Sequence, residues 1–237
     1  MNFKPNFKTV ELCLTYRCNL KCNNCSNLCT QAPINSDGDL RLCEIDFFLN
    51  DIEGKGVEQI TLHGGEPVLN PNIDIIVEKL CAFREKTGVR LWLLSNNSND
   101  RIRQKITSIH VKYNIPLGIA TKDGNNLPYI PVNESPSDLE LDYTLGCFQT
   151  SDCGICFNYL GYFPCSPMAA AARVFGFAGV QLIDHLDIET CNEFFNLHCK
   201  HCGFAIPDRR RVTEQTSTET WIKNFNEYRQ TIKETDR

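Results

Sequence analysis

The sequence predicts an α/β fold built around a parallel sheet, and three observations support this prediction. Short runs of β-branched and apolar residues alternate with helical apolar patterns along the first half of the chain, which is the order expected of βαβ units. The run 89–95 (VRLWLLS) is almost continuously apolar, as a parallel strand buried on both faces should be. The candidate site motifs directly follow predicted strands, at the sheet edge where ligands bind in such folds.

The individual elements follow from local patterns. Residues 8–15 (KTVELCLT) read as a strand, and a cysteine-rich loop comes directly after them. A helix is predicted over 42–54, because Leu42, Ile45 and Leu49 recur at helical spacing and two glycines end the pattern. By the same reasoning the chain continues with a strand at 57–63, a helix at 72–86, a strand at 89–95, a helix at 100–113 and a strand at 115–121.

The second half of the chain has a different character. Residues 122–138 are rich in proline, asparagine, aspartate and glycine, which predicts a loop or linker, and strands within 128–145 are left open. Aromatic residues at helical spacing predict a last helix over Thr220–Lys233. We therefore expect a core at 1–125, a linker or extra strand at 126–145, and a small cysteine-rich module with a C-terminal helix at 146–237.

Composition narrows the class of protein. The 237 residues are 42% hydrophobic and 22% charged with a net charge of −5, which is ordinary for a globular protein. There is no basic stripe, so nucleic acid is not an expected partner. The N-terminal stretch does not resemble a signal peptide, and no apolar run is long enough for a membrane span, so a cytoplasmic location is expected.

Cysteine is the unusual component. Of the 14 cysteines, one group ends at Cys81 and the other begins at Cys147. Disulfides are rare in the cytosol, so many cysteines in a cytosolic chain of this size indicate metal. Two groups separated by a cysteine-free stretch predict two metal centres.

The first group contains Cys18, Cys22 and Cys25 in the order C-x3-C-x2-C. Fully ligated iron–sulfur clusters usually take four cysteines, so three thiolates on one loop would leave one iron of a cubane open. About forty residues later the chain reads Gly64-Gly65-Glu66-Pro67. Together the two motifs resemble the radical S-adenosylmethionine (SAM) superfamily, while a zinc knuckle or a set of buried thiols is the alternative.

This resemblance implies both a fold and a set of cofactors. The fold would be a partial (β/α) barrel, abbreviated here, with a [4Fe–4S] cluster held by the three cysteines and SAM on the open iron. A one-electron reductant such as flavodoxin or ferredoxin would drive SAM cleavage to the 5′-deoxyadenosyl radical. Gly64, Gly65, Glu66 and Pro67 would contact the SAM amino group, and Ser95 and Asn97 would lie against its ribose. Asn24 stands where the family often has an aromatic residue.

The second cysteine group resembles the Twitch and SPASM extensions of radical SAM enzymes. A cysteine, a hairpin ending in Pro-Cys within GYFPC, and a later C-x2-C carry this resemblance. It implies a second, auxiliary [4Fe–4S] cluster, and the shorter Twitch form fits the few cysteines present. The implied ligands are Cys147, Cys165, Cys199 and Cys202. A zinc ribbon formed by Cys153, Cys156, Cys199 and Cys202 is the alternative, because zinc tolerates that spacing.

The resemblance implies a radical SAM enzyme, with an oxidoreductase as the leading hypothesis. The expected substrate is a small polar metabolite, for example a sugar or aminocyclitol whose alcohol is oxidised with the auxiliary cluster as electron acceptor. A peptide-modifying epimerase or cross-linking maturase is the second hypothesis, although the short stretch before residue 8 would leave no room for a leader-binding domain. A non-enzymatic metal-binding module is the third. No catalytic residue is assigned.

Overall fold

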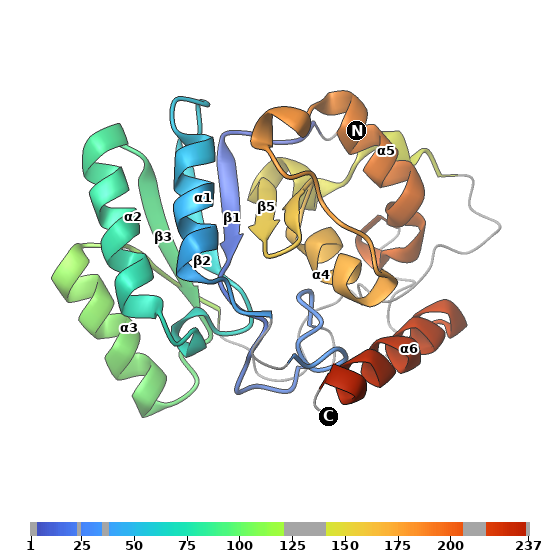
Figure 1. The fold of residues 1–237 in the computed structure, drawn as a ribbon, viewed down its shortest axis with the longest axis horizontal. Helices are drawn as coiled ribbons and strands as arrows, with labels where there is room; N and C mark the ends of the chain where they lie inside the picture. The colour runs from blue at the N-terminus through green and yellow to red at the C-terminus, as the bar shows by residue number, and fades with distance from the viewer. Residues whose placement is uncertain (1–3, 23–24, 35–37, 121–140, 206–216, 236–237) are drawn as a thin grey trace.

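The computed structural model describes residues 4–22, 25–34, 38–120, 141–205 and 217–235. Its centre is a 6-stranded sheet in the order β4-β3-β2-β1-β5-β6. The strands are β1 (Thr9–Cys13), β2 (Gln59–His63), β3 (Arg90–Ser95), β4 (Leu117–Ile119), β5 (Ile155–Asn158) and β6 (Gly161–Phe163). The longer helices are α1 (Leu42–Ile52), α2 (Ile73–Thr87), α3 (Asp100–Tyr113), α4 (Ser166–Phe175), α5 (Ile188–His198) and α6 (Glu219–Thr235) (Figure 1).

The predicted fold class is confirmed. Strands β1 to β4 pair in parallel, and a helix connects each to the next, which makes three successive βαβ units. Every predicted strand and helix of residues 8–121 is present, with shorter strands than the patterns suggested. Pro116 shows why for the last strand: proline has no N–H for the ladder, and β4 starts after it.

The sheet continues into the cysteine-rich second half of the chain. Strand β5 lies parallel to β1, and β6 returns antiparallel to β5, so the predicted hairpin before Cys165 is the edge of the main sheet. The sheet thus crosses the predicted boundary at residue 146. Most of the predicted linker lies outside the described residues, and the division into core and module stays a prediction.

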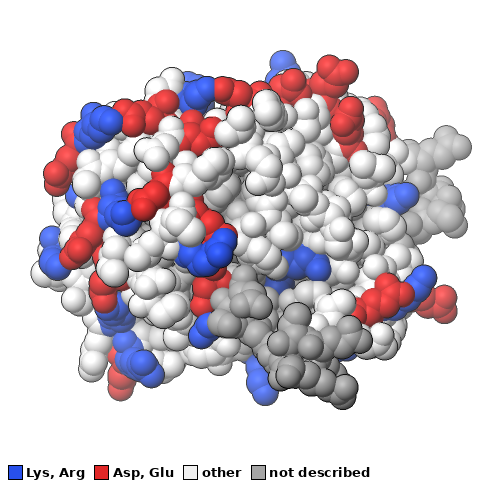
Figure 2. All heavy atoms as spheres, in the orientation of Figure 1, with Lys and Arg blue, Asp and Glu red and all other residues white. Residues whose placement is uncertain are grey.

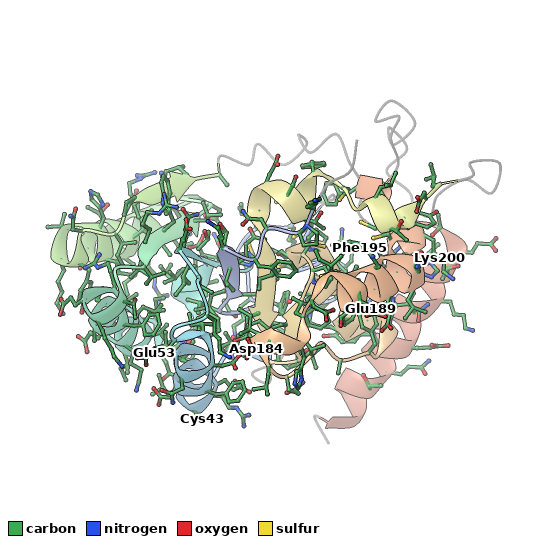
Figure 3. All side chains as sticks on the ribbon, turned by 90° about the horizontal axis from the view of Figure 1, so that it is seen from above. Cys43, Glu53, Asp184, Glu189, Phe195 and Lys200 are labelled. Atoms are coloured by element: carbon green, nitrogen blue, oxygen red, sulfur yellow. The ribbon has the colours of Figure 1, made fainter. Side chains whose placement is uncertain are left out.

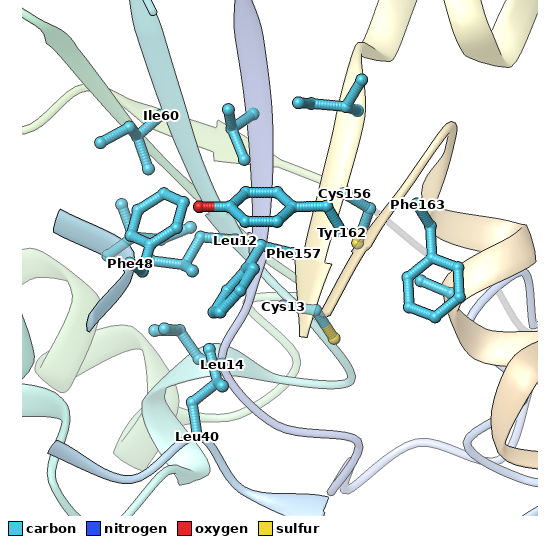
Figure 4. Close-up of a cluster of buried hydrophobic side chains, with 14 of the residues drawn as sticks. Leu12, Cys13, Leu14, Leu40, Phe48, Ile60, Cys156, Phe157, Tyr162 and Phe163 are labelled. Carbon is cyan, nitrogen blue, oxygen red and sulfur yellow. The ribbon is translucent and has the colours of Figure 1, made fainter. Parts of the chain in front are cut away.

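Alternation along β1 gives the sheet two different faces. Val10 and Leu12 point toward α1 and are fully buried. On this face Phe157 packs against Phe48 with ring centroids 5.0 Å apart and against Tyr162 at 4.6 Å. Figure 4 shows this aromatic cluster between α1 and the β5–β6 hairpin. It ties the C-terminal strands to the core, because offset aromatic contacts add to the free energy gained from apolar burial.

The opposite face of the sheet is more polar. Asn158, which is fully buried, donates to the Tyr16 hydroxyl at 2.8 Å and to the Ala169 carbonyl at 3.1 Å. The bond to Ala169 places α4 on the face of β5 opposite to Phe157. Glu11 and His63 lie on this second face, which therefore carries the ionisable groups.

Charged side chains lie mainly on the periphery. Figure 2 shows both signs intermingled over α1, α2 and α3. Several form bridges between neighbouring helices, such as Lys79 with Asp46 at 2.6 Å, and exposed pairs of this kind contribute little to stability. In the view of Figure 3, Asp184 lies beside the end of α1, where it pairs with Lys55. No helix in the described part of the chain is long and apolar enough to cross a membrane.

Candidate active site and cysteine cavity

The GGEP motif lies against the segment that enters the cysteine loop. The backbone N–H of Gly65 donates to Thr15 O at 2.8 Å, and that of Glu66 donates to Arg17 O at 2.8 Å. A Cβ on Gly64 would lie 2.2 Å from Thr15 O, and one on Gly65 would lie 2.2 Å from Arg17 O. Glycine is needed at both positions because the GGEP backbone packs against the backbone of residues 15–17. The sequence had suggested contact with SAM as the role of these glycines.

The three loop cysteines lie close to one another. All are half-buried, and burial raises the pKa of the Cys18 thiol, with the neighbouring Cys25 and Cys22 thiols adding to the shift. Leu20 N donates to Cys18 Sγ at 3.4 Å and Asn96 Nδ2 donates at 3.7 Å. Three accessible thiols, with N–H donors directed at one of them, form a donor set that fits an iron–sulfur cluster. Asn24, the departure from the family pattern, lies outside the described residues.

Cys29 also contacts this loop. Its thiol is buried and hydrogen-bonds with Cys25, and this contact, followed by burial, raises the pKa of Cys29 well above its usual range. Cys29 lies outside the C-x3-C-x2-C spacing, but it follows Cys25 by only four residues in the chain.

Glu66 joins GGEP to the turn after β3. The carboxylate is fully buried and accepts from Ser95 Oγ at 3.0 Å and from Asn96 N at 2.9 Å. Burial raises the pKa of Glu66, while these hydrogen bonds oppose the rise. Pro67 opens the short helix η2 (Pro67–Leu69). The predicted SAM contacts of Gly64, Gly65, Glu66 and Pro67 remain predictions, but the structure brings these residues to one edge of the sheet with Ser95.

The polar turn after β3 contains a left-handed residue. Asn97 takes a left-handed conformation with φ of 48°, and its N–H donates to Ser95 Oγ at 3.1 Å. Its neighbour Asn96 lines the cavity described next, and its amide also donates to Asn19 at 3.0 Å. Asn96 lies between Ser95 and Asn97, whose predicted contacts with SAM stay predictions.

The first cavity, called the sheet cavity below, lies on the polar face at the ends of the strands. It has a volume of about 160 Å³ and is bounded by residues of the cysteine loop, the GGEP turn, the turn after β3 and the start of α4. His63 lies in its wall with Nε2 4.0 Å from Cys156 Sγ, and burial lowers the pKa of this histidine to about 4. The lining residues are Glu11, Ser26, Asn27, His63, Gly64, Gly65, Leu94, Ser95, Asn96, Ala120, Gln149, Ser166 and Pro167.

The second cavity, called the cysteine cavity, contains the four predicted auxiliary ligands. Cys147, Cys165, Cys199 and Cys202 all line this cavity. Burial raises the pKa of Cys165, and the nearby thiols of the other three add to the shift. Burial likewise raises the pKa of Cys202 to about 12. Ligated thiolates would escape this penalty, because metal coordination favours the deprotonated form.

These cysteines come from separate segments of the second half of the chain. Cys165 follows the β5–β6 hairpin and caps the N-terminus of α4, while Cys199 ends α5 and Cys202 lies three residues further on. Trp221 of α6 is buried and donates from Nε1 to His201 O at 2.7 Å. His198 stacks on Phe177 with ring centroids 3.6 Å apart. The aromatic stacking and the α6 contact hold the C-x2-C segment in place.

The zinc-ribbon set is not brought together in the same way. Cys156 is fully buried in β5 on the sheet face near His63, and Cys153 ends the π-helical turn η4 (Gln149–Cys153). Neither borders the cysteine cavity. Within the described ranges no three His, Cys, Asp or Glu side chains are spaced to hold a single metal ion. A cubane differs from zinc in this respect, because each cysteine binds a different iron and the sulfurs stand further apart.

Arg173 of α4 fastens the cysteine loop to the rest of the molecule. Its guanidinium donates to Ala32 O and to Asn27 O, each at 3.1 Å, and lies 3.7 Å from the Tyr16 ring centroid. Asn27 in turn donates to Gly64 O at 2.6 Å and accepts from Ser166 Oγ at 3.0 Å. The cysteine loop, GGEP and α4 are therefore one hydrogen-bonded unit.

Comparisons with known proteins agree with this geometry. Residues 10–117 match a family described as a 4Fe-4S single cluster domain. A GTP 3′,8-cyclase of Moorella thermoacetica is 35% identical over 82 residues, covering 34% of this chain and 25% of that protein. A GTP 3′,8-cyclase of Mannheimia succiniciproducens is 30% identical over 95 residues, covering 40% and 27%. The chain thus spans about a quarter of the length of these curated relatives.

One solved structure is also similar. A crystal structure of BtrN in complex with AdoMet and 2-DOIA overlaps with a TM-score of 0.49 at 15% identity, covering 90% of this chain and 97% of that one. The family match covers the segment that holds the cysteine loop and GGEP, and a [4Fe–4S] cluster fits the three thiols found there. These matches support a place in the radical SAM superfamily for the segment at residues 10–117.

Proposed function

We propose that this protein oxidises an alcohol of a small polar substrate, a sugar or an aminocyclitol, and that an auxiliary [4Fe–4S] cluster held by Cys147, Cys165, Cys199 and Cys202 accepts an electron. The observation that carries the proposal is that the two cavities adjoin. Gln149 and Pro167 line both the sheet cavity and the cysteine cavity. A substrate in the first cavity would therefore lie next to an acceptor in the second, and electron transfer slows steeply with distance.

The lining of the sheet cavity suits a small polar substrate. Ser26, Asn27, Asn96, Gln149 and Ser166 supply hydroxyl and amide groups, which can hydrogen-bond to the hydroxyls of a polyol. Apolar contact comes from Leu94, Ala120 and Pro167. Polar residues outnumber apolar ones in this lining, which suits a polyol better than an apolar ligand.

The chain's own residues divide the remaining tasks. Cys18, Cys22 and Cys25 would hold the first cluster, and Glu66 fixes the turn that carries Ser95 and Asn96. When bound, the cluster and SAM supply the electron and the 5′-deoxyadenosyl radical. A flavodoxin or ferredoxin would deliver that electron from outside. Asn27 and Arg173 keep the loop on α4, so that the substrate space and the cysteine loop keep their relative position.

The experiment that tests this function begins with SAM cleavage. Anaerobically reconstituted protein with reductant and SAM should form 5′-deoxyadenosine, and Cys18→Ala, Cys22→Ala or Cys25→Ala should each abolish it. Cys43→Ala is the matched control, because Cys43 is exposed on α1. This variant should cleave SAM like the wild type. Undiminished 5′-deoxyadenosine from any loop variant would contradict the assignment.

The substrate class is tested separately. A panel of polyols and amino sugars, with short peptides beside it, is incubated with the active enzyme, and products are identified by mass. Loss of two hydrogens from a polyol supports the proposal. Conversion of a peptide with no reaction of any polyol would instead establish a peptide-modifying enzyme.

A further inference from the structure

Glu11 is a buried carboxyl in the wall of the sheet cavity. It lies in the middle of β1, paired in register with Thr61 of β2 on one side and with Cys156 of β5 on the other. Only 8% of the residue is exposed, and it belongs to the cavity lining. The strand alternation that buries Val10 and Leu12 against α1 turns Glu11 to the opposite face.

One oxygen of the Glu11 carboxyl lacks a hydrogen-bond donor in the described part of the chain. Its Oε2 is buried and has no hydrogen-bond partner within the described ranges. Leaving a buried polar atom unpaired costs free energy, and native structures rarely tolerate it outside functional sites. A ligand that enters the cavity with a donor group would supply the missing partner.

The surroundings of Glu11 leave its charge uncompensated. The titratable groups that face it are Cys13 of β1, His63 of β2, Cys156 of β5 and Cys153 of η4. Burial lowers the pKa of His63 to about 4, so the imidazole is neutral near pH 7. Burial raises the pKa of Cys13 and of Cys153 to about 12, so these thiols are also uncharged.

Burial alone raises the pKa of Glu11 to about 8. Both protonation states of the carboxyl are then populated slightly above neutral pH, which is the range in which a proton acceptor works best. Among the described residues that line the sheet cavity, only Glu11 and His63 titrate near neutrality or below, and His63 titrates several units lower.

We propose that Glu11 is the catalytic proton acceptor, taking the hydroxyl proton from the substrate carbon that is oxidised. The inference rests on the proposed function and deepens it. The C–H hydrogen leaves as an atom to the 5′-deoxyadenosyl radical, and the O–H proton moves to a carboxylate oxygen of Glu11. One electron leaves the substrate for the auxiliary [4Fe–4S] cluster, which completes the two-electron oxidation to a carbonyl.

The same placement selects among substrates. Above pH 8 the Glu11 carboxylate attracts an ammonium group and repels a phosphate, because unlike charges attract and like charges repel strongly in a low-dielectric site. A polyol or amino polyol should therefore react in preference to its phosphorylated form. Myo-inositol, glucosamine and their monophosphates are suitable probes.

The first test compares Glu11→Gln with Glu11→Asp and with Glu58→Gln in the reconstituted enzyme. Glu58 is an exposed glutamate just before β2 that pairs with Lys8, so it receives the same change outside the cavity. Glu11→Gln should lower oxidation of the reacting probe roughly 100-fold or more, in line with the loss of a general base. Glu58→Gln should oxidise the probe and cleave SAM like the wild type, because the change lies outside the cavity.

Turnover by Glu11→Gln within about threefold of wild type would overturn the proposal, and the proposed function would survive. Absent SAM cleavage in the wild type would instead remove the proposed function. In the wild type the oxidation rate should rise with pH through about 8, as the carboxylate forms. Glu11→Gln should lose that rise.

A second measurement needs no turnover. Infrared difference spectra of the holoenzyme, recorded against pH, show the carbonyl stretch of a protonated carboxyl, and the band missing in Glu11→Gln belongs to Glu11. Titration of that band near 8 supports the proposal. Titration near the ordinary glutamate value would show a hydrated or paired carboxylate and would overturn it.

Discussion

Gly64 and Gly65 show how single residues position this site. Gly64 has φ of 149°, in the range that favours glycine, and both glycines touch the backbone that leads into Cys18. The contact is between main chains, so side-chain movement cannot relieve it. The GGEP turn can therefore lie this close to the cysteine loop only because Gly64 and Gly65 have no Cβ.

We predict that Gly64→Ala destabilises the protein far more than Gly54→Ala. Gly54 also has a positive φ, of 76°, but nothing lies within 4 Å of its added Cβ. It therefore measures the backbone strain alone, roughly 1–3 kcal/mol. Gly64→Ala adds the collision with Thr15 O, so its melting temperature should fall further and its iron content should drop. Equal melting temperatures for the two variants would show that the two backbones can separate without cost.

At the scale of elements, α4 is the joint between the two cysteine groups. Its first turn follows Cys165, and Ser166 there donates a hydrogen bond to Asn27. In its last turn, Arg173 donates to the carbonyls of Asn27 and Ala32. One helix thus contacts the cysteine loop at both of its ends. The helix lies on the β5–β6 hairpin, so the cysteine loop is held against the sheet edge.

We predict that Arg173→Met loosens the cysteine loop. The change leaves two carbonyls without their charged donor and removes the stacking on Tyr16, which together should lower stability by roughly 3 kcal/mol. Iron in the first cluster should fall, and SAM cleavage should fall with it. Arg173→Lys should recover only part of the loss, because an ammonium cannot reproduce the planar fork.

Arg103→Met is the control for that experiment. Arg103 is exposed on α3 and pairs with Asp100, so the same substitution there should leave iron content and stability near those of the wild type. Normal iron content in Arg173→Met would mean that the loop holds its shape without α4.

At the scale of the whole molecule, one sheet carries both cysteine groups. Strand β1 leads into the first group, and its parallel neighbour β5 leads through the hairpin to Cys165 of the second. The two cavities adjoin because these strands are side by side. The second cysteine group is thus built onto the same sheet as the first.

We predict that the protein binds about eight irons in two clusters, and that Cys199→Ala loses about four of them. Because metal binding is coupled to folding, the same variant should lower the melting temperature of the C-terminal part. The double variant Cys153→Ala/Cys156→Ala should keep its iron, since neither thiol borders the cysteine cavity. Loss of about four irons in the double variant, or binding of one zinc by the wild type, would overturn the ligand choice.

Several features could be predicted from the sequence because they are local. The βαβ alternation, the hairpin before Cys165 and the last helix all follow from periodicity and turn residues within short windows. The cysteine spacing and GGEP indicated the superfamily for the same reason. Helix α5 was not predicted, although Ile188, Cys191 and Phe195 stand at helical spacing after the N-cap Asp187.

What the sequence alone determined is the chemistry of the first site: three thiols on one loop after a strand, and a glycine-rich turn after the next strand. What only the tertiary structure decided is how distant segments meet. Burial of Glu11 and the shared wall of the two cavities depend on β5 lying beside β1, about 145 residues later in the chain. Such long-range pairing follows from the packing of the whole molecule, and no local pattern encodes it.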